Sequence, residues 1–243
     1  RFPALKCIQV TSAGLDRVPL DYCKAHGITV YNAGGVYSAP MAEFVLGGIL
    51  QLYKESKFFA ENQAAHRWEK HRGLRELSGK IACIIGTGSV GSAIVRRLRA
   101  FDVKTVGVNR SGHPAAEFDQ TQPTCRLDDL LPLADLVICA MPLTAETAGL
   151  FDSVRLAKIK SGAVFVNVAR GKVADQQSLV EALQSGQLSG AVLDVFEEEP
   201  LPRSSPLWDM EQVILTPHNS FVGEHNGERL FRLICKNLES FAQ

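Results

Sequence analysis

A glycine-rich turn between an apolar run and a helical pattern constrains this 243-residue chain more than any other feature. The apolar run 81–85 continues directly into Gly-Thr-Gly-Ser-Val-Gly at 86–91, and a helical pattern begins at once. In that context the first glycine allows a tight turn, the second admits a pyrophosphate, and the third permits close packing. The first amides of the following helix favour an anion. The alternative is a glycine turn that merely reverses the chain. The strand before this turn and the helix after it instead predict a dinucleotide site formed by Gly86, Gly88, Ser89, Val90 and Gly91.

Apolar strand-like runs alternate with helical patterns along the whole chain. The expected strands are 7–10, 29–31, 81–85, 104–108, 136–140, 164–167, 191–194 and 213–215, and the expected helices are 19–25, 39–60, 90–101, 127–131, 178–185 and 222–241. This alternation predicts an α/β fold with a doubly wound parallel sheet of Rossmann type. We expect residues 38–217 to form the dinucleotide-binding domain. Residues 1–37 and 218–243 should form a second lobe, which lacks its N-terminal part because the chain opens at Arg1 rather than Met.

Composition excludes several classes of protein. The chain is 46% hydrophobic and 21% charged, which is enough to build a core and argues against disorder. Its 26 basic and 26 acidic residues leave no net charge, which argues against a nucleic-acid partner. No apolar run reaches the roughly 18 residues that a membrane span needs. The six cysteines form no CxxC pair or Cys/His cluster, so we expect no metal site. Their even number could mean disulfides, but the size of the chain and the lack of a signal sequence favour a reducing, cytoplasmic location.

The residues that follow the expected strand 104–108 bear on the choice of cofactor. Dinucleotide folds often place a carboxylate about 20 residues after the glycine turn, on the ribose hydroxyl. Here Asn109, Arg110 and Ser111 stand at that place. An arginine can bind a phosphate through two hydrogen bonds, and asparagine does not repel one. The pattern favours NADP(H), with NAD(H) possible; a solvated surface arginine is the alternative reading of Arg110.

Three further side chains stand near the ends of expected strands, where open α/β sheets bind their ligands. Arg170 follows the apolar run 164–167 and suits bidentate capture of a carboxylate, although it could also hold the strand end through a salt bridge. Three glutamates at 197–199 follow Asp194, and His218 follows a Thr-Pro pair. A lone histidine is more often structural. An arginine, a carboxylate and a histidine together supply an anion anchor, an acid/base and a group that orients it.

These motifs resemble those of the D-isomer-specific 2-hydroxyacid dehydrogenases, and the resemblance covers essentially the whole chain. It rests on the turn at 86–91, on VICAMPLTAETAGL at 137–150, KSGAVFVNVARG at 160–171, LDVFEEEPLP at 193–202 and TPH at 216–218. The resemblance implies an NAD(P)-dependent oxidoreductase that transfers a hydride between a nicotinamide cofactor and a small D-2-hydroxy acid or 2-keto acid. It also implies that the second lobe is a partial flavodoxin-like fold.

The resemblance assigns roles to individual residues. Arg170 should bind the substrate carboxylate and carbonyl, His218 should be the acid/base, and Glu199 should be its partner, rather than Glu197 or Glu198. Substrate-binding positions are implied at Ser12, Ala13, Gly14 and Gly35, together with Arg170. Further cofactor-lining positions are implied at Met141, Pro142, Val168, Ala169, Arg170, Asp194, His218 and Ser220.

The stretch 41–68 bears on assembly. It is rich in aromatic residues, and the resemblance implies that it packs across a two-fold axis, so we expect a homodimer. A single buried helix with a surface arm is the plainer interpretation. The alternative function is a dinucleotide-sensing binding protein of co-repressor type. The sequence shows no obvious interaction tail and carries all three reactive side chains, which argues against that alternative.

Overall fold

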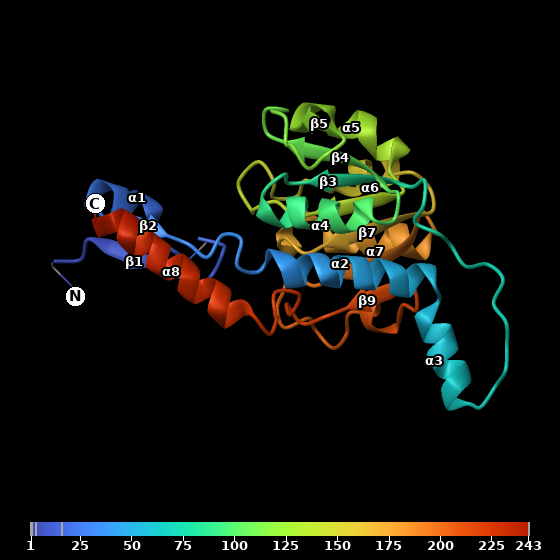
Figure 1. Cartoon of the computed structure of the whole chain (residues 1–243). Coiled ribbons are helices and arrows are strands. Elements are labelled where there is room, and N and C mark those ends of the chain that lie inside the picture. Colours follow the sequence, from blue (N-terminus) through green and yellow to red (C-terminus); the bar gives the residue numbers. More distant parts are fainter. Residues whose placement is uncertain (1, 3, 16, 243) are drawn as a thin grey trace.

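The computed structural model describes residues 2, 4–15 and 17–242, and places them in a larger and a smaller part (Figure 1). Within these residues the larger part holds a seven-stranded sheet, here called the large sheet, in the order β5-β4-β3-β6-β7-β8-β9. Its strands are β3 (Ile81–Ile85), β4 (Lys104–Asn109), β5 (Gln120–Pro123), β6 (Leu136–Cys139), β7 (Ala163–Asn167), β8 (Leu188–Leu193) and β9 (Val213–Leu215). Every neighbouring pair is parallel. The order reverses between β3 and β6, which confirms the doubly wound Rossmann sheet.

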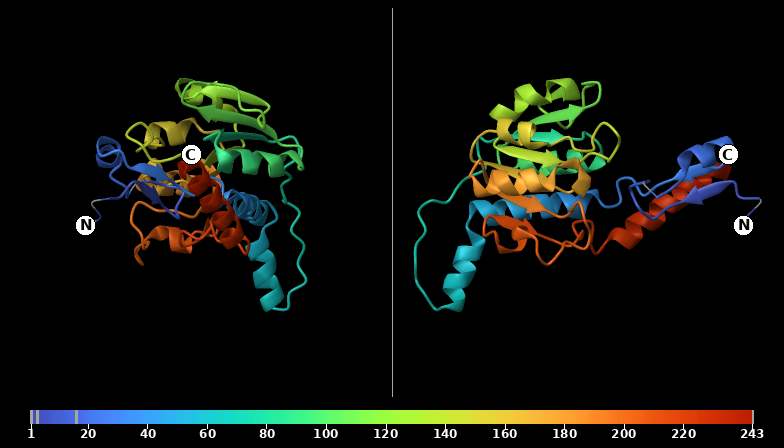
Figure 2. Two further views of the ribbon diagram at one scale, coloured as in Figure 1. Left: turned by 60° about the vertical axis from the view of Figure 1, so that its left-hand side comes forward. Right: turned by 180° about the vertical axis from the view of Figure 1, so that it is seen from behind.

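Helices cover both faces of the large sheet, because alternate residues of each strand point to opposite faces. Ala82 and Ile84 of β3 belong to one core with helices α2 (Ser38–Tyr53) and α4 (Ser89–Arg99). Cys83 and Ile85 belong to the other core, with α5 (Leu127–Leu130), α6 (Ser153–Lys158) and α7 (Gln176–Gln184). Figure 1 shows α2 and α4 on the near face, and Figure 2 shows the opposite face from behind. Short 3-10 helices occur at Thr124–Arg126, Leu131–Leu133, Gly171–Val173 and Pro206–Asp209.

Two cysteines are ordinary core residues, as their apolar surroundings predicted. Burial raises the pKa of the Cys83 thiol to about 12 and also raises the pKa of Cys139. Because only a thiolate is a good nucleophile or metal ligand, neither group is chemically active at neutral pH.

The smaller part joins the two ends of the chain. β1 (Cys7–Gln9) and β2 (Thr29–Tyr31) form a parallel pair, here called the small sheet, connected by α1 (Leu20–Ala25). The last helix, α8 (Asn226–Ala242), returns from the larger part and lies along this pair (Figures 1 and 2). The side-chain amide of Asn237 donates to Gln9 Oε1 at 2.7 Å, across 228 residues of sequence. The two parts are therefore connected by two crossings, one after β2 and one before α8.

The structure corrects three sequence-based expectations. Helix α6 (Ser153–Lys158) was not among the expected helices. The single helix expected over 39–60 is wrong: α2 ends at Tyr53, and α3 (Ser56–Ala64) starts after Glu55, whose φ of +50° is left-handed. The helical arm then leaves the large sheet and returns through an extended segment (Figure 1). The six strands expected between 81 and 215 are seven in the described chain, because β5 was missed. β5 reads Gln-Thr-Gln-Pro and lies at the sheet edge, so it carries no apolar alternation.

Candidate active site

The glycine turn has the geometry of a pyrophosphate cradle. Gly86 has a φ of +110°, and a Cβ there would stand 2.5 Å from the carbonyl oxygen of Ala140. A Cβ on Gly91 would stand only 2.0 Å from the Gly86 oxygen, so this glycine serves the turn itself as well as its packing on β3. Around Gly88, in contrast, no described atom outside this glycine and its two chain neighbours lies within 4 Å of the Cβ position, and none of the described side chains caps α4 there. Open space above uncapped helix amides fits an anionic group.

The loop after β4 is tied to this turn through Asn109. Its side-chain nitrogen donates to Thr87 Oγ1 at 3.1 Å and to the His113 carbonyl at 2.9 Å, while its Oδ1 accepts from the Gly112 amide at 2.7 Å. The amide of Asn109 is therefore used within the loop. Arg110 and Ser111 are exposed beside the turn.

A cleft of about 630 Å³ lies between the two parts at the carboxyl ends of the large sheet. It brings together many of the predicted residues: Ser12, Ala13, Gly14, Val90, Met141, Pro142, Val168, Ala169, Arg170, Asp194, His218 and Ser220. The glycines of the turn, Ser89, Asn109 to Ser111, and Gly35 are not part of its lining. Glu199 does not line the cleft either, but it contacts His218 directly. A cleft between two lobes at the strand ends is the usual place for a ligand in such a sheet.

His218 and Glu199 form a hydrogen-bonded pair at the cleft. His218 Nδ1 lies 2.8 Å from Glu199 Oε2, and the other carboxylate oxygen of Glu199 accepts from the Phe196 amide at 3.0 Å. Both side chains are about two-fifths exposed, at 42% and 36%. Glu197 is occupied elsewhere, because its Oε1 accepts from the amide of Gln176 at the start of α7. Of the three consecutive glutamates, the structure thus places the third on the histidine.

Asp194 holds the segment that carries His218. Its carboxylate is buried and accepts from Thr216 Oγ1 at 2.6 Å, from the Asn219 amide at 2.7 Å and from the Ser220 amide at 3.0 Å. The amide of His218 donates to the Asp194 carbonyl at 2.8 Å. His218 has a φ of +52°, which is uncommon outside glycine and asparagine and is maintained by these contacts.

Arg170 projects from the loop directly after β7 and lines the cleft, half-buried. Its Nη1 donates to the Ala169 carbonyl at 2.7 Å, and its own carbonyl accepts from the buried Asn167 side chain at 3.0 Å. The next residue, Gly171, packs tightly: a Cβ there would stand 1.8 Å from the carbonyl carbon of Phe196. This close approach places the Arg170 loop against the segment that leads to Glu199.

The loop after β1 forms the opposite wall of the cleft. The Asn32 side chain donates to the Ala13 carbonyl at 2.8 Å, and the Ala33 amide donates to the Ser12 carbonyl at 2.9 Å. These bonds join the loops that follow β1 and β2. Gly35 lies in the second loop with a φ of +89°.

Several lining residues were not found from the sequence: Thr11, Leu15, Tyr37, Met41, Ala140 and Phe221. Ala140 directly precedes Met141 at a strand end, so position could have indicated it. Tyr37 and Phe221 come from the two crossings between the parts. Their rings meet edge to face at 5.7 Å, and the Tyr37 hydroxyl donates to the Thr11 carbonyl. No motif marks such residues, because only the course of both crossings makes them neighbours.

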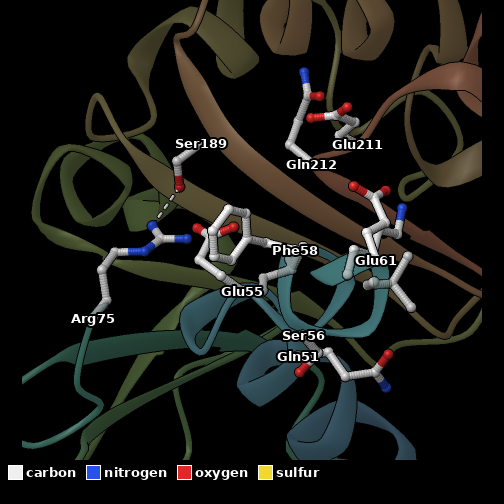
Figure 3. A pocket seen from close by; sticks show the side chains of 12 residues that line it. Gln51, Glu55, Ser56, Phe58, Glu61, Arg75, Ser189, Glu211 and Gln212 are labelled. Atoms are coloured by element: carbon white, nitrogen blue, oxygen red, sulfur yellow. Dashed lines mark hydrogen bonds between the residues drawn. The ribbon is translucent and has the colours of Figure 1, made fainter. Parts of the chain in front are cut away.

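A second hollow lies at the junction of α2, α3 and β8, away from these residues (Figure 3). It is smaller, at about 240 Å³, and Arg75 reaches across it to Ser189 Oγ at 2.6 Å. The Arg75 guanidinium also lies 4.2 Å from the centre of the buried Tyr53 ring. These contacts fasten the arm segment to the large sheet, which is a structural role. Within the described ranges, no group of three or more His, Cys, Asp or Glu side chains could hold a metal, and no helix is long and apolar enough to cross a membrane.

The fold and the cleft define a class of protein. A doubly wound sheet with a glycine turn after its first strand binds a dinucleotide, and an arginine beside a histidine–carboxylate pair suits acid–base chemistry on a small anion. The chain belongs to the D-isomer-specific 2-hydroxyacid dehydrogenase family: residues 46–220 match the model of the NAD-binding domain of these enzymes.

Individual relatives agree with this assignment. A glyoxylate reductase of Thermofilum pendens is 35% identical over 243 residues, which are 97% of this chain and 71% of the relative. Glyoxylate/hydroxypyruvate reductase B of Salmonella gallinarum is 35% identical over 223 residues, 90% of this chain and 69% of the relative. The fold is also similar to that of an NADPH-dependent glyoxylate/hydroxypyruvate reductase of Sinorhizobium meliloti, whose structure was solved in complex with NADP and sulfate. The two structures have a TM-score of 0.85 and 28% sequence identity, and the match covers 99% of this chain and 76% of that one.

The chain is therefore an oxidoreductase that transfers a hydride between a nicotinamide cofactor and a small D-2-hydroxy acid or 2-keto acid. This confirms the expectation from the sequence motifs. The dinucleotide-sensing binding protein is not favoured.

Proposed function

We propose that this enzyme is an NADP(H)-preferring reductase of small 2-keto acids of the glyoxylate and hydroxypyruvate type. The observation that carries the proposal is the His218–Glu199 pair at 2.8 Å, on the same cleft as Arg170. The names of the relatives support the substrate class. In this proposal residues 38–217 bind the cofactor, while residues 1–37 and 218–243 complete the substrate side of the cleft.

Each residue has a distinct part in the proposed mechanism. The Arg170 guanidinium anchors the substrate carboxylate and polarises the neighbouring carbonyl. His218 donates a proton from Nε2 to the carbonyl oxygen as it becomes a hydroxyl, because its Nδ1–H is held by Glu199. The Glu199 carboxylate stabilises the protonated ring before the transfer. A nicotinamide cofactor would supply the hydride to the carbonyl carbon in reduction, and would accept it from that carbon in oxidation. Oxidation of the hydroxy acid reverses these steps, with His218 as the proton acceptor.

The test of this function is a substrate panel. Glyoxylate, hydroxypyruvate, pyruvate and phenylpyruvate are each supplied with NADPH, and loss of absorbance at 340 nm is followed. We expect the highest kcat/KM for glyoxylate or hydroxypyruvate. A higher kcat/KM for phenylpyruvate than for either of them would overturn the proposed substrate class.

Arg170→Lys should raise KM for the keto acid by about 10- to 100-fold, because lysine keeps the charge but loses the planar two-pronged donor. Steady-state kinetics measures the effect, and Lys172→Ala, an exposed neighbour, is the control. A KM close to that of the unmodified enzyme would mean that another residue holds the carboxylate.

The cofactor preference should depend on Arg110. A charge-assisted bidentate contact with a phosphate contributes about 1.5–3 kcal/mol, or roughly 10- to 100-fold in affinity. We therefore expect kcat/KM to be higher with NADPH than with NADH, and Arg110→Ala to reduce the NADPH value while sparing NADH. Arg232→Ala, on the exposed side of α8, is the control. Equal values for both cofactors in the unmodified enzyme would contradict the preference.

We also propose that the arm formed by α3 and residues 65–76 pairs two copies of the chain. Trp68 is 93% exposed and lines a surface hollow together with Phe59, which is 37% exposed. Burial of such side chains against a second copy is favourable. Light scattering at micromolar concentration should show a dimer, and Trp68→Ser should shift it toward monomer, whereas Trp208→Ser, 52% exposed on the main body, should not. A monomeric unmodified protein would contradict this assembly.

A cytoplasmic location remains our proposal. All six cysteines, each within the described part of the chain, are free, which agrees with a reducing compartment.

A further inference from the structure

The loop from Asn109 to His113 is organised before any ligand binds. Asn109 makes three side-chain hydrogen bonds, to Thr87 of the glycine turn, to the Gly112 amide and to the His113 carbonyl. Its own carbonyl accepts from Thr124 Oγ1 at 3.2 Å. Gly112 has a φ of +74°, and a Cβ there would stand 2.7 Å from Pro123. The loop is thus held on the glycine turn on one side and on the end of β5 on the other.

This arrangement leaves hydrogen-bond donors on the exposed side of the loop. Arg110, Ser111 and His113 are all exposed. Ser111 Oγ and His113 Nδ1 lie 3.1 Å apart and share one hydrogen bond. A hydroxyl and a neutral imidazole carry two polar hydrogens between them. Whichever group donates within the pair, one donor hydrogen remains for a ligand: the histidine Nε2–H or the serine O–H.

The chemistry of the loop matches the group that distinguishes NADP from NAD. The tip of the second strand of a doubly wound sheet faces the adenosine ribose, where NADP carries its 2′-phosphate. We propose that His113, paired with Ser111, is a third ligand of that 2′-phosphate and a specificity-determining residue for the cofactor. The inference rests on the proposed NADP(H) preference. It adds His113, which lies outside the stretch 109–111, to Arg110 as a ligand of the phosphate.

A nearby carboxylate makes this additional donor important. Glu146 lies in the loop after β6 and receives a hydrogen bond from Thr144 Oγ1 at 2.7 Å. That hydrogen bond and, less strongly, the positive charge of Arg110 lower the pKa of Glu146. A fixed negative charge therefore competes with a phosphate for Arg110. Glu146 is fully exposed, so water weakens this competition without removing it.

The experiment measures binding rather than catalysis. Isothermal titration calorimetry compares adenosine 2′,5′-bisphosphate with adenosine 5′-monophosphate, which differ only in the 2′-phosphate. His113→Ala should weaken binding of the bisphosphate by about 3- to 10-fold, the effect of one hydrogen bond to a charged group at an exposed site, and should leave the monophosphate unchanged. The loop should survive, because Asn109 bonds the backbone carbonyl of His113. His113→Gln, which keeps an N–H donor, should restore part of the loss.

The variant Arg110→Ala distinguishes a failure of the role of His113 from a failure of the proposed NADP(H) preference. If Arg110→Ala weakens bisphosphate binding and His113→Ala does not, the role of His113 is wrong and the proposed cofactor preference stands. If neither change affects the bisphosphate, the cofactor preference itself fails. Equal weakening of both ligands by His113→Ala would also overturn the inference, since it would show a structural role in the loop.

Discussion

His218→Ala should lower kcat for keto acid reduction by about 10²- to 10⁴-fold, the range that positioned acid–base catalysis contributes. The carbonyl oxygen would lose its proton donor, while the glycine turn that binds the cofactor would be untouched. Stopped-flow or steady-state absorbance at 340 nm measures turnover, and fluorescence titration with NADPH measures binding. NADPH affinity should change less than about twofold. Activity within a fewfold of the unmodified enzyme would show that another group supplies the proton.

Glu199→Gln tests the partner of that histidine. Without the carboxylate, Nδ1 of His218 loses the acceptor that holds the imidazole ring in place. The kcat for keto acid reduction, measured by absorbance at 340 nm, should therefore fall, though less than in His218→Ala, because the proton donor itself remains. An unchanged kcat would contradict the role of Glu199. Glu198→Gln is the control. Glu197→Gln is unsuitable as a control because Glu197 receives a hydrogen bond from the start of α7.

Gly88→Ala should abolish cofactor binding without disturbing the fold. Gly88 has φ −76° and ψ −165°, which alanine adopts freely, and its Cβ would stand in open space on the side where a pyrophosphate would lie. We expect dinucleotide affinity to fall by at least about 100-fold, because the backbone can no longer approach the phosphates. The melting temperature should change by less than about 2 °C, since a change of 1 kcal/mol shifts it by roughly 2–4 °C in a domain of this size.

Gly91→Ala is the matched contrast. Its Cβ would stand 2.0 Å from the Gly86 oxygen, a backbone atom that cannot move away without opening the turn. Overpacking of this kind costs about 3 kcal/mol or more, which corresponds to a loss of roughly 6–12 °C in melting temperature. Differential scanning calorimetry of both variants, with and without NADPH, gives the two readings. Normal NADPH binding by Gly88→Ala, or a normal melting temperature for Gly91→Ala, would contradict the roles assigned to these glycines.

The buried strands could be read from the sequence, because burial on both faces leaves an unbroken apolar run. β3, β6 and β7 are of this kind, and each begins or ends within one residue of its expected bound. β5 could not be read in this way, because it is a polar edge strand that depends on pairing with β4. The break between α2 and α3 was also missed. It falls at Glu55, which has a left-handed φ of +50° and lies two positions after Tyr53, a buried residue whose ring contacts Arg75, 22 positions later.

The candidate site likewise has features that the sequence predicts and features that it does not. The sequence by itself determined which chemical groups are present, and the resemblance of its motifs indicated which of them act. The local patterns are a glycine turn after one strand, an arginine after another and a histidine after a third. These groups come together because a parallel sheet has the carboxyl ends of its strands at one edge. The doubly wound fold follows from the same local periodicity.

Only the tertiary structure decided which side chains meet. Three examples join segments separated by 19 or more positions: the Tyr37 and Phe221 rings, the Asn32 bond to Ala13, and the organisation of residues 109–113 around Thr87. Periodicity in a sequence reports the face on which a residue lies, because that depends on neighbours within a few positions. It does not report distances between segments, since these depend on the path of the backbone through both crossings and on the packing of the cores between them.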